Sequence, residues 1–100
     1  MGGGFLEKVY ERALLKELSL RGLSARSQVP LAVQYKGETV GEYVADIVVE
    51  DRILLELKAQ AGLADVHAAQ LINYLRASGK RVGLLVNFTV PKATIKRYLV

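Results

Sequence analysis

Two carboxylates and a lysine, Asp46, Glu56 and Lys58, interrupt two stretches of sequence that are otherwise almost entirely apolar. Residues 43–49 and 52–59 are rich in β-branched residues and leucine, which is typical of buried or half-buried strands. Charged side chains are rare inside a protein unless they are paired or bind something. These three residues are therefore the first candidates for chemistry.

The turn between the two strands determines which residues face each other. A hairpin centred on Asp51 places Asp46 opposite Glu56, with Lys58 two residues further along the same face. Cross-strand partners bring their Cβ atoms to about 5 Å, and two carboxylates at that distance repel unless a proton or a cation lies between them. Mg²⁺ or Mn²⁺, which prefer oxygen ligands, would satisfy both carboxylates.

The two faces of this hairpin differ in polarity. The charged residues share their face with Val44, Val48 and Leu54, so the polar groups are confined to one end of an apolar surface. The second face is wholly apolar and should be core: Ala45, Ile47, Val49, Ile53, Leu55, Leu57 and Ala59. The alternative is that Lys58 forms a salt bridge with Asp46 or Glu56 on a solvated sheet face.

Composition excludes several other kinds of active site. The 100 residues, 51% of them hydrophobic, predict one domain over residues 1–100, with residues 1–4 as a flexible or truncated start. Without cysteine there is no thiolate or cysteine zinc site, and a single histidine, His67, excludes paired-histidine metal centres. Chemistry must rest on carboxylates, lysine, hydroxyls and amides.

Charge and hydropathy bear on partners and location. The formal net charge of +4 weakly favours a polyanionic partner. The apolar stretches are far shorter than the roughly 20 residues that span a bilayer, and no basic-then-apolar leader opens the chain. We therefore expect a soluble, cytoplasmic protein with no membrane partner.

Periodicity predicts the elements that must position the charged residues. Apolar residues fall at helical spacing over 5–21, and a half-buried strand ends at Gly37. The hairpin follows, then a helix over 65–78, a buried strand over 81–88 and a truncated helix over 93–100. The order is α-β-β-β-α-β-(α). Because the crossover helix requires parallel neighbours, we expect a mixed sheet flanked by helices, an α/β fold of the α+β sandwich kind.

Each of the two long predicted helices carries polar residues on one of its own faces. The helix over 65–78 places His67, Gln70 and Tyr74 at offsets of 0, 3 and 7. In the first helix, Glu7 and Tyr10 lie three residues apart. The alternatives are a surface or capping histidine at 67 and an ordinary first-turn glutamate at 7, favoured by the helix dipole.

These residues together resemble the PD-(D/E)XK nuclease superfamily. Asp46, nine residues and then Glu56-Leu57-Lys58 resemble its core motif, and Gln70-x-x-x-Tyr74 resembles the QxxxY motif of one of its branches. The segment 4–10, GFLEKVY, is similar to the pattern that names the small GxxExxY proteins within it. Ala45 stands where the superfamily's name has proline. The likeness covers nearly the whole chain and implies a restriction-endonuclease-like core.

The resemblance implies a metal site on the hairpin. Asp46 and Glu56 would bind catalytic Mg²⁺ or Mn²⁺, with the backbone carbonyl of Leu57 as a further ligand. Lys58 would orient the attacking water or help to deprotonate it. Glu7 would hold a second metal ion or order water around the first.

The second helix would face this site across a cleft. Gln70, counted with the catalytic set, and Tyr74 would position the substrate or the metal, while His67 and Tyr10 would support them. The reaction would be hydrolysis of phosphodiester bonds in nucleic acid, with DNA as the expected substrate.

Two other functions remain open at this point. One is a catalytically inactive nucleic-acid-binding or assembly module that keeps the nuclease fold, and the other is a structural domain with a salt-bridge network on its hairpin. Because so small a domain offers little surface for sequence readout, we expect shape recognition by a homodimer or targeting by another protein. Three apolar residues of the last predicted helix would serve dimerisation or belong to the core: Ile95, Tyr98 and Leu99.

Overall fold

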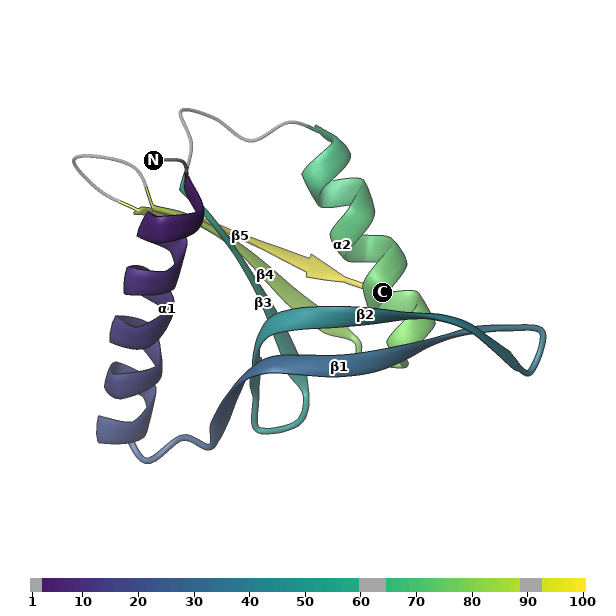
Figure 1. The fold of residues 1–100 in the computed structure, drawn as a ribbon, viewed down its shortest axis with the longest axis horizontal. Helices are drawn as coiled ribbons and strands as arrows, with labels where there is room; N and C mark the ends of the chain where they lie inside the picture. The colour runs from purple at the N-terminus through teal and green to yellow at the C-terminus, as the bar shows by residue number, and fades with distance from the viewer. Residues whose placement is uncertain (1–2, 60–64, 89–92) are drawn as a thin grey trace.

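Five strands form one mixed sheet with two helices packed on it (Figure 1). The computed structural model describes residues 3–59, 65–88 and 93–100. The elements, in chain order, are α1 (Gly3–Leu20), β1 (Ala25–Tyr35), β2 (Glu38–Val49), β3 (Ile53–Lys58), α2 (Asp65–Ser78), β4 (Val82–Phe88) and β5 (Ala93–Leu99).

The strands lie in the sheet in chain order, β1-β2-β3-β4-β5. Only β3 and β4 are parallel, and α2 forms the crossover between them. The other three pairs are antiparallel. The mixed sheet and its two helices confirm the predicted fold class and the restriction-endonuclease-like core.

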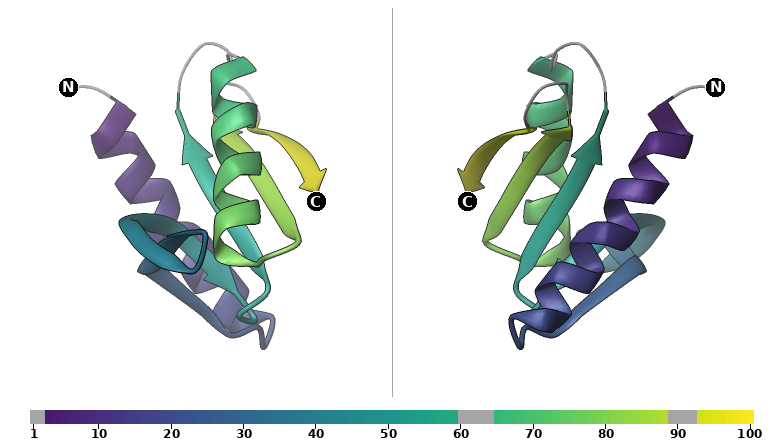
Figure 2. Two further views of the ribbon diagram at one scale, coloured as in Figure 1. Left: turned by 90° about the vertical axis from the view of Figure 1, so that its right-hand side faces the viewer. Right: turned by 90° about the vertical axis from the view of Figure 1, so that its left-hand side faces the viewer.

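The helices cover opposite faces of the sheet (Figure 2). Leu71 and Leu75 of α2 are buried in a cluster with Leu54 of β3 and Leu85 of β4. On the other face, leucines of α1 pack against a second cluster that includes Leu55. The core strands β3 and β4 thus contribute apolar side chains to both faces, as expected for strands buried between two helices.

The hairpin of β2 and β3 has the predicted register as far as Ile47 and Leu55, but the expected pair of Asp46 with Glu56 lies beyond the paired residues. Val48 pairs with Leu54, and the neighbouring pairs on either side follow the same alignment. The turn residues Glu50 and Asp51 have φ angles of 53° and 56°, the left-handed conformation that a tight hairpin turn requires at both central positions.

The predicted division of the hairpin into two faces is correct with one exception. Ile47, Val49, Leu55 and Leu57 are buried together on the α1 face. Ala45, however, is buried on the α2 face, in the same cluster as Val48. The alternation of β2 therefore changes between these two residues, because the sheet is distorted around Asp46.

The last predicted element is wrong: Ala93–Leu99 form strand β5, whereas a truncated helix was expected over residues 93–100. The physical reason is that β4 would otherwise expose a row of backbone donors and acceptors, which β5 satisfies along its length. Of the three residues expected to serve dimerisation or core packing, Tyr98 packs on the core, whereas Ile95 and Leu99 are 62% and 63% exposed.

Other sequence expectations concern the ends and loops. Helix α1 begins at Gly3, two residues earlier than expected, and residues 1–2 of the expected flexible or truncated start lie outside the described residues. Ala61-Gly62 and Pro91 are expected from the sequence to interrupt the elements on either side of them, and these residues also lie outside the described ones. Within the described chain, no helix is long and apolar enough to cross a membrane.

Candidate active site

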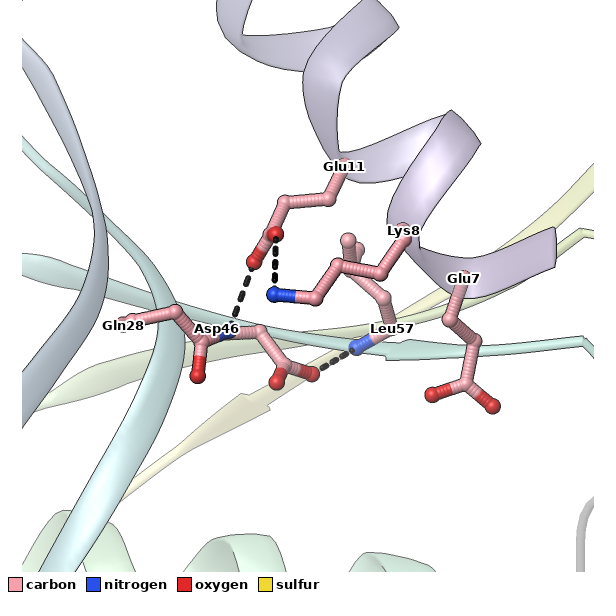
Figure 3. Close-up of a pocket in the computed structure, with 6 residues that line it drawn as sticks. All are labelled: Glu7, Lys8, Glu11, Gln28, Asp46 and Leu57. Atoms are coloured by element: carbon pink, nitrogen blue, oxygen red, sulfur yellow. Dashed lines mark hydrogen bonds and ion pairs between the residues drawn. The ribbon is translucent and has the colours of Figure 1, made fainter. Parts of the chain in front are cut away.

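Strands β2 and β3 separate beside Asp46. Their pairing extends through Ile47 and Leu55 and then stops. Beyond this point the Asp46 side chain takes the place of backbone pairing, since its Oδ2 accepts a hydrogen bond of 2.8 Å from the Leu57 amide (Figure 3). The fork between β2 and β3 thus holds the aspartate in one orientation next to the predicted glutamate.

Glu56 is half-buried at the same fork, and one of its carboxylate oxygens lacks a hydrogen bond among the described residues. Its Oε1 is buried and lacks a hydrogen-bond partner within the described part of the chain. Burial raises the pKa of Glu56 to about 7, against the opposing effects of Lys58 and of a hydrogen bond from the Asp46 backbone, and Glu7 raises it further. The Glu56 carboxyl group therefore gains or loses its proton near neutral pH.

Asp46 has a similar electrostatic setting. Burial is the main cause that raises its pKa, and the nearby carboxylate of Glu11 adds to the effect. The Leu57 amide, Lys58 and Lys8 act in the opposite direction. The fork therefore holds two carboxyl groups whose charged forms are penalised by burial, which is typical of sites that bind a cation or transfer a proton.

A cavity of about 230 Å³ opens beside Asp46. Among the described residues it is lined by Glu7, Lys8, Glu11, Gln28, Asp46 and Leu57 (Figure 3). The side chains come from α1, β1, β2 and β3. Glu7 and Asp46 thus line the same cavity.

Three residues of this cavity were not assigned a role from the sequence: Lys8, Glu11 and Gln28. Glu11 is only 5% exposed, and its Oε1 accepts a hydrogen bond of 2.8 Å from Gln28 Nε2, while Lys8 Nζ lies 3.8 Å from Oε2. One signal was available for Glu11, because it follows Glu7 by four residues and so shares its helix face. Nothing local marked Gln28 as a partner for α1.

Lys58 lies on the same strand as Glu56 and is half-buried. Within residues 3–59, 65–88 and 93–100 it forms no ion pair within 4 Å, although its charge acts on both carboxylates. Val48 and Leu54, on the face of the hairpin assigned to the charges, are 1% and 0% exposed. This face is therefore buried at Val48 and Leu54, whereas Val44 is 45% exposed. The described contacts include no salt bridge of the alternative interpretation.

The other candidate residues on the two helices do not line the cavity beside Asp46 in the described part of the chain. On α2, the exposed Gln70 donates a 2.8 Å hydrogen bond to the hydroxyl of Tyr74, whose ring stacks on Tyr43 of β2 at 3.5 Å. Neither is among the described residues that line the cavity. His67 is half-buried on α2. Tyr10 stacks on Phe88 at 4.2 Å and so ties α1 to β4.

The oxygen donors at the fork fit a hard divalent cation. No group of three or more histidine, cysteine or acidic side chains among the described residues could hold a metal ion by itself. Mg²⁺, however, is commonly held by one or two carboxylates and keeps several waters. The unpartnered Oε1 of Glu56 is the kind of buried acceptor that such an ion would satisfy.

Comparisons with known proteins define the class. The family model of the PD-(D/E)XK nuclease superfamily matches residues 1–98, and the chain therefore belongs to that superfamily. This membership suggests nuclease activity, and nucleases of this superfamily generally use divalent metals.

Solved structures support the fold. Four solved chains match, among them the crystal structure of SSO0001, with a TM-score of 0.75 and 22% identity. The match covers 97% of this chain but 50% of SSO0001, so this chain spans about half the length of that protein. The comparison with curated proteins gives no match.

Proposed function

We propose that the protein is a metal-dependent nuclease that hydrolyses phosphodiester bonds in nucleic acid, with DNA as the expected substrate. The observation that carries this proposal is the pair of buried carboxylates at the fork, Asp46 and Glu56, with one carboxylate oxygen lacking a partner among the described residues. Superfamily membership supports the assignment of these carboxylates to catalysis.

Asp46, Glu56 and the backbone carbonyl of Leu57 would hold Mg²⁺ or Mn²⁺. When bound, such an ion supplies Lewis-acid stabilisation of charge on the phosphate and a more acidic water. The hydrogen bond from the Leu57 amide keeps one Asp46 oxygen oriented, so that the other is available to a ligand. Glu7, on the wall of the cavity, would order water or a second ion there.

Lys58 is proposed to orient the attacking water or to help remove its proton. Hydrolysis joins the water oxygen to phosphorus and breaks the bond to the leaving oxygen, which takes up a proton. The ammonium group of Lys58 also offsets negative charge that develops on the phosphate. Its freedom from a tight ion pair among the described residues supports this assignment.

We also propose that the chain belongs to the GxxExxY group of the superfamily. Helix α1 carries that motif and places Glu7 on the wall of the cavity with Asp46. Gln70 and Tyr74 would position the substrate from α2, with His67 and Tyr10 in supporting roles.

Cleavage assays test the proposed function. The purified protein is incubated with single-stranded, duplex and branched DNA and with RNA, in Mg²⁺ or Mn²⁺, alongside Asp46→Ala and Lys58→Ala. Lys80→Ala is the matched control, because Lys80 contacts the distant turn residue Asp51. We expect cleavage by wild type and the control only. Cleavage unchanged in both site variants would identify a contaminant, and nucleic-acid binding without metal-dependent cleavage would identify an inactive module.

A further inference from the structure

Strand β1 departs from regular strand geometry at Gln28, which the register places opposite Asp46, and this local change of backbone direction is the bend of β1. The pairs Ser27–Ile47 and Val29–Ala45 leave these two residues between them. Gln28 has a φ of 52°, a left-handed conformation that residues other than glycine rarely adopt without a compensating interaction. Something outside the strand must therefore stabilise the bend.

The compensating interaction comes from α1. Gln28 Nε2 donates a 2.8 Å hydrogen bond to Oε1 of Glu11, a carboxylate that is only 5% exposed (Figure 3). Lys8 lies 3.8 Å from the other oxygen. Because a buried carboxylate needs donors, and a hydrogen bond to a charged acceptor is strong, Glu11 holds the Gln28 side chain in place.

The bend in β1 coincides with the irregularity in β2. Ala45 and Val48 are buried on one face of the sheet although they lie three residues apart, and Ile47 is buried on the other. At the position between them, Asp46 turns its carboxylate onto the Leu57 amide. Strained backbone of this kind persists where the surrounding structure holds it, and it is concentrated at functional sites.

We propose that Gln28 and Glu11 are positioning residues for Asp46. Glu11 anchors the Gln28 side chain, Gln28 keeps β1 bent, and the bend keeps Asp46 out of a regular ladder and aimed into the fork. The inference rests on the proposed function, in which Asp46 binds the metal ion. It assigns no contact between the metal ion and Gln28 or Glu11.

Two substitutions of Gln28 separate backbone positioning from a direct side-chain role. Gln28→Leu keeps the size of the side chain but removes the donor and disfavours the left-handed conformation. Gln28→Gly removes the whole side chain but adopts that conformation without strain. Gln34→Leu is the control, because Gln34 is another β1 glutamine, hydrogen-bonded to Thr39 across the same pair of strands.

The first measurement is amide hydrogen exchange at Leu57 in the metal-free protein, followed by NMR. This amide reports directly on the Asp46 carboxylate. We expect its protection to fall about tenfold or more in Gln28→Leu, and to stay within about threefold of wild type in Gln28→Gly and Gln34→Leu. Equal loss in the glycine and leucine variants would overturn the inference, as would unchanged protection in both. If Gln28→Leu does not fold, loss of protection in Gln28→Gly overturns it.

The second measurement is Mn²⁺ affinity by calorimetry. We expect Gln28→Leu to weaken it about tenfold, the usual effect of losing a group that orients a metal ligand, and Gln28→Gly to weaken it less. For Glu11, Gln keeps an acceptor without the charge and should preserve affinity, whereas Leu should weaken it about tenfold. Equal loss in Glu11→Gln and Glu11→Leu would make Glu11 a ligand and overturn its role as an anchor.

The two readouts separate failure of this inference from failure of the proposed function. Absence of Mn²⁺ binding and cleavage in wild type would contradict the nuclease proposal. The exchange rate of the Leu57 amide would still decide whether Gln28 controls the orientation of Asp46.

Discussion

The two ends of the β2–β3 hairpin each carry a pair of acidic residues, but the pairs differ in their surroundings. At the turn, Glu50 Oε2 accepts a 2.7 Å hydrogen bond from the Ser24 amide, and Asp51 lies 3.5 Å from Arg26 and 3.4 Å from Lys80. Glu50 and Asp51 are exposed and have partners. Their contacts tie the turn to neighbouring segments.

The two acidic residues at the fork are less exposed and less completely partnered than those at the turn. Asp46 and Glu56 are half-buried, burial raises the pKa of both, and Oε1 of Glu56 has no partner among the described residues. The acidic residues at the turn make contacts that stabilise the fold. The acidic residues at the fork have charged forms that burial destabilises. The fork is where a cation is expected to bind.

Substitutions at the fork and at the turn of the hairpin should differ most in their effect on the cleavage rate. Asp46→Asn keeps an acceptor for the Leu57 amide but weakens metal binding, so we expect cleavage to fall more than about 100-fold, beyond the usual effect of losing an outer-shell group. Asp51→Asn should leave the rate within about twofold. Initial rates on labelled DNA in Mg²⁺ provide the comparison, and similar losses in both variants would remove the distinction.

Metal affinity should depend on pH through the fork alone. A proton on Glu56, whose pKa is raised to about 7, competes with the ion. Mn²⁺ affinity should therefore rise about tenfold from pH 5.5 to 6.5 and level off above pH 7. Calorimetric titrations at a series of pH values measure this, and an affinity that is flat across this range would contradict the role of Glu56.

The metal-free protein should lose stability as the pH rises. The Glu56 carboxyl releases its proton near pH 4.5 when unfolded and near pH 7 when folded, so the folded state binds more protons between these values. Asp46, with its raised pKa, acts in the same direction. We expect the unfolding free energy to fall by about 2 kcal/mol from pH 5 to pH 8. Urea unfolding in EDTA measures it, and an increase over this range would contradict the account.

Neutralising one glutamate at each end should change stability in opposite directions. Glu56→Gln removes a penalised buried charge and should stabilise the metal-free protein by about 1 kcal/mol at pH 8, although its amide brings donors that need partners. Glu50→Gln weakens an exposed contact with the Ser24 amide and should destabilise by less than about 1 kcal/mol. Thermal unfolding of both variants is the measurement. Destabilisation by Glu56→Gln would favour the salt-bridge alternative.

The sequence predicted the elements whose signals are local. The period-two pattern of residues 43–59 and the turn at Asp51 predicted the hairpin register, which the structure follows as far as the pair Ile47–Leu55. The resemblance of residues 4–10 to the GxxExxY pattern implied a role for Glu7 near the metal, and Glu7 lines the same cavity as Asp46. The roles assigned to Lys58, Gln70 and Tyr74 remain predictions.

The remaining features depend on contacts between distant residues. The bend at Gln28 is stabilised by Glu11, 17 residues away, and no property of residues 25–35 alone reveals it. Residues 93–100 fit a short helix as well as a short strand, and the exposed edge of β4 decides between them. The face change at Ala45 follows from the same distortion around Asp46.

Crystals soaked in Mn²⁺ provide the most direct test that the fork is the metal site. Anomalous diffraction locates the ion without reference to activity or substrate. We predict a peak within coordination distance of the Asp46 and Glu56 carboxylates, and none at Glu50 and Asp51. A soaked crystal with no peak at the fork, or with its only peak at the turn, would contradict it.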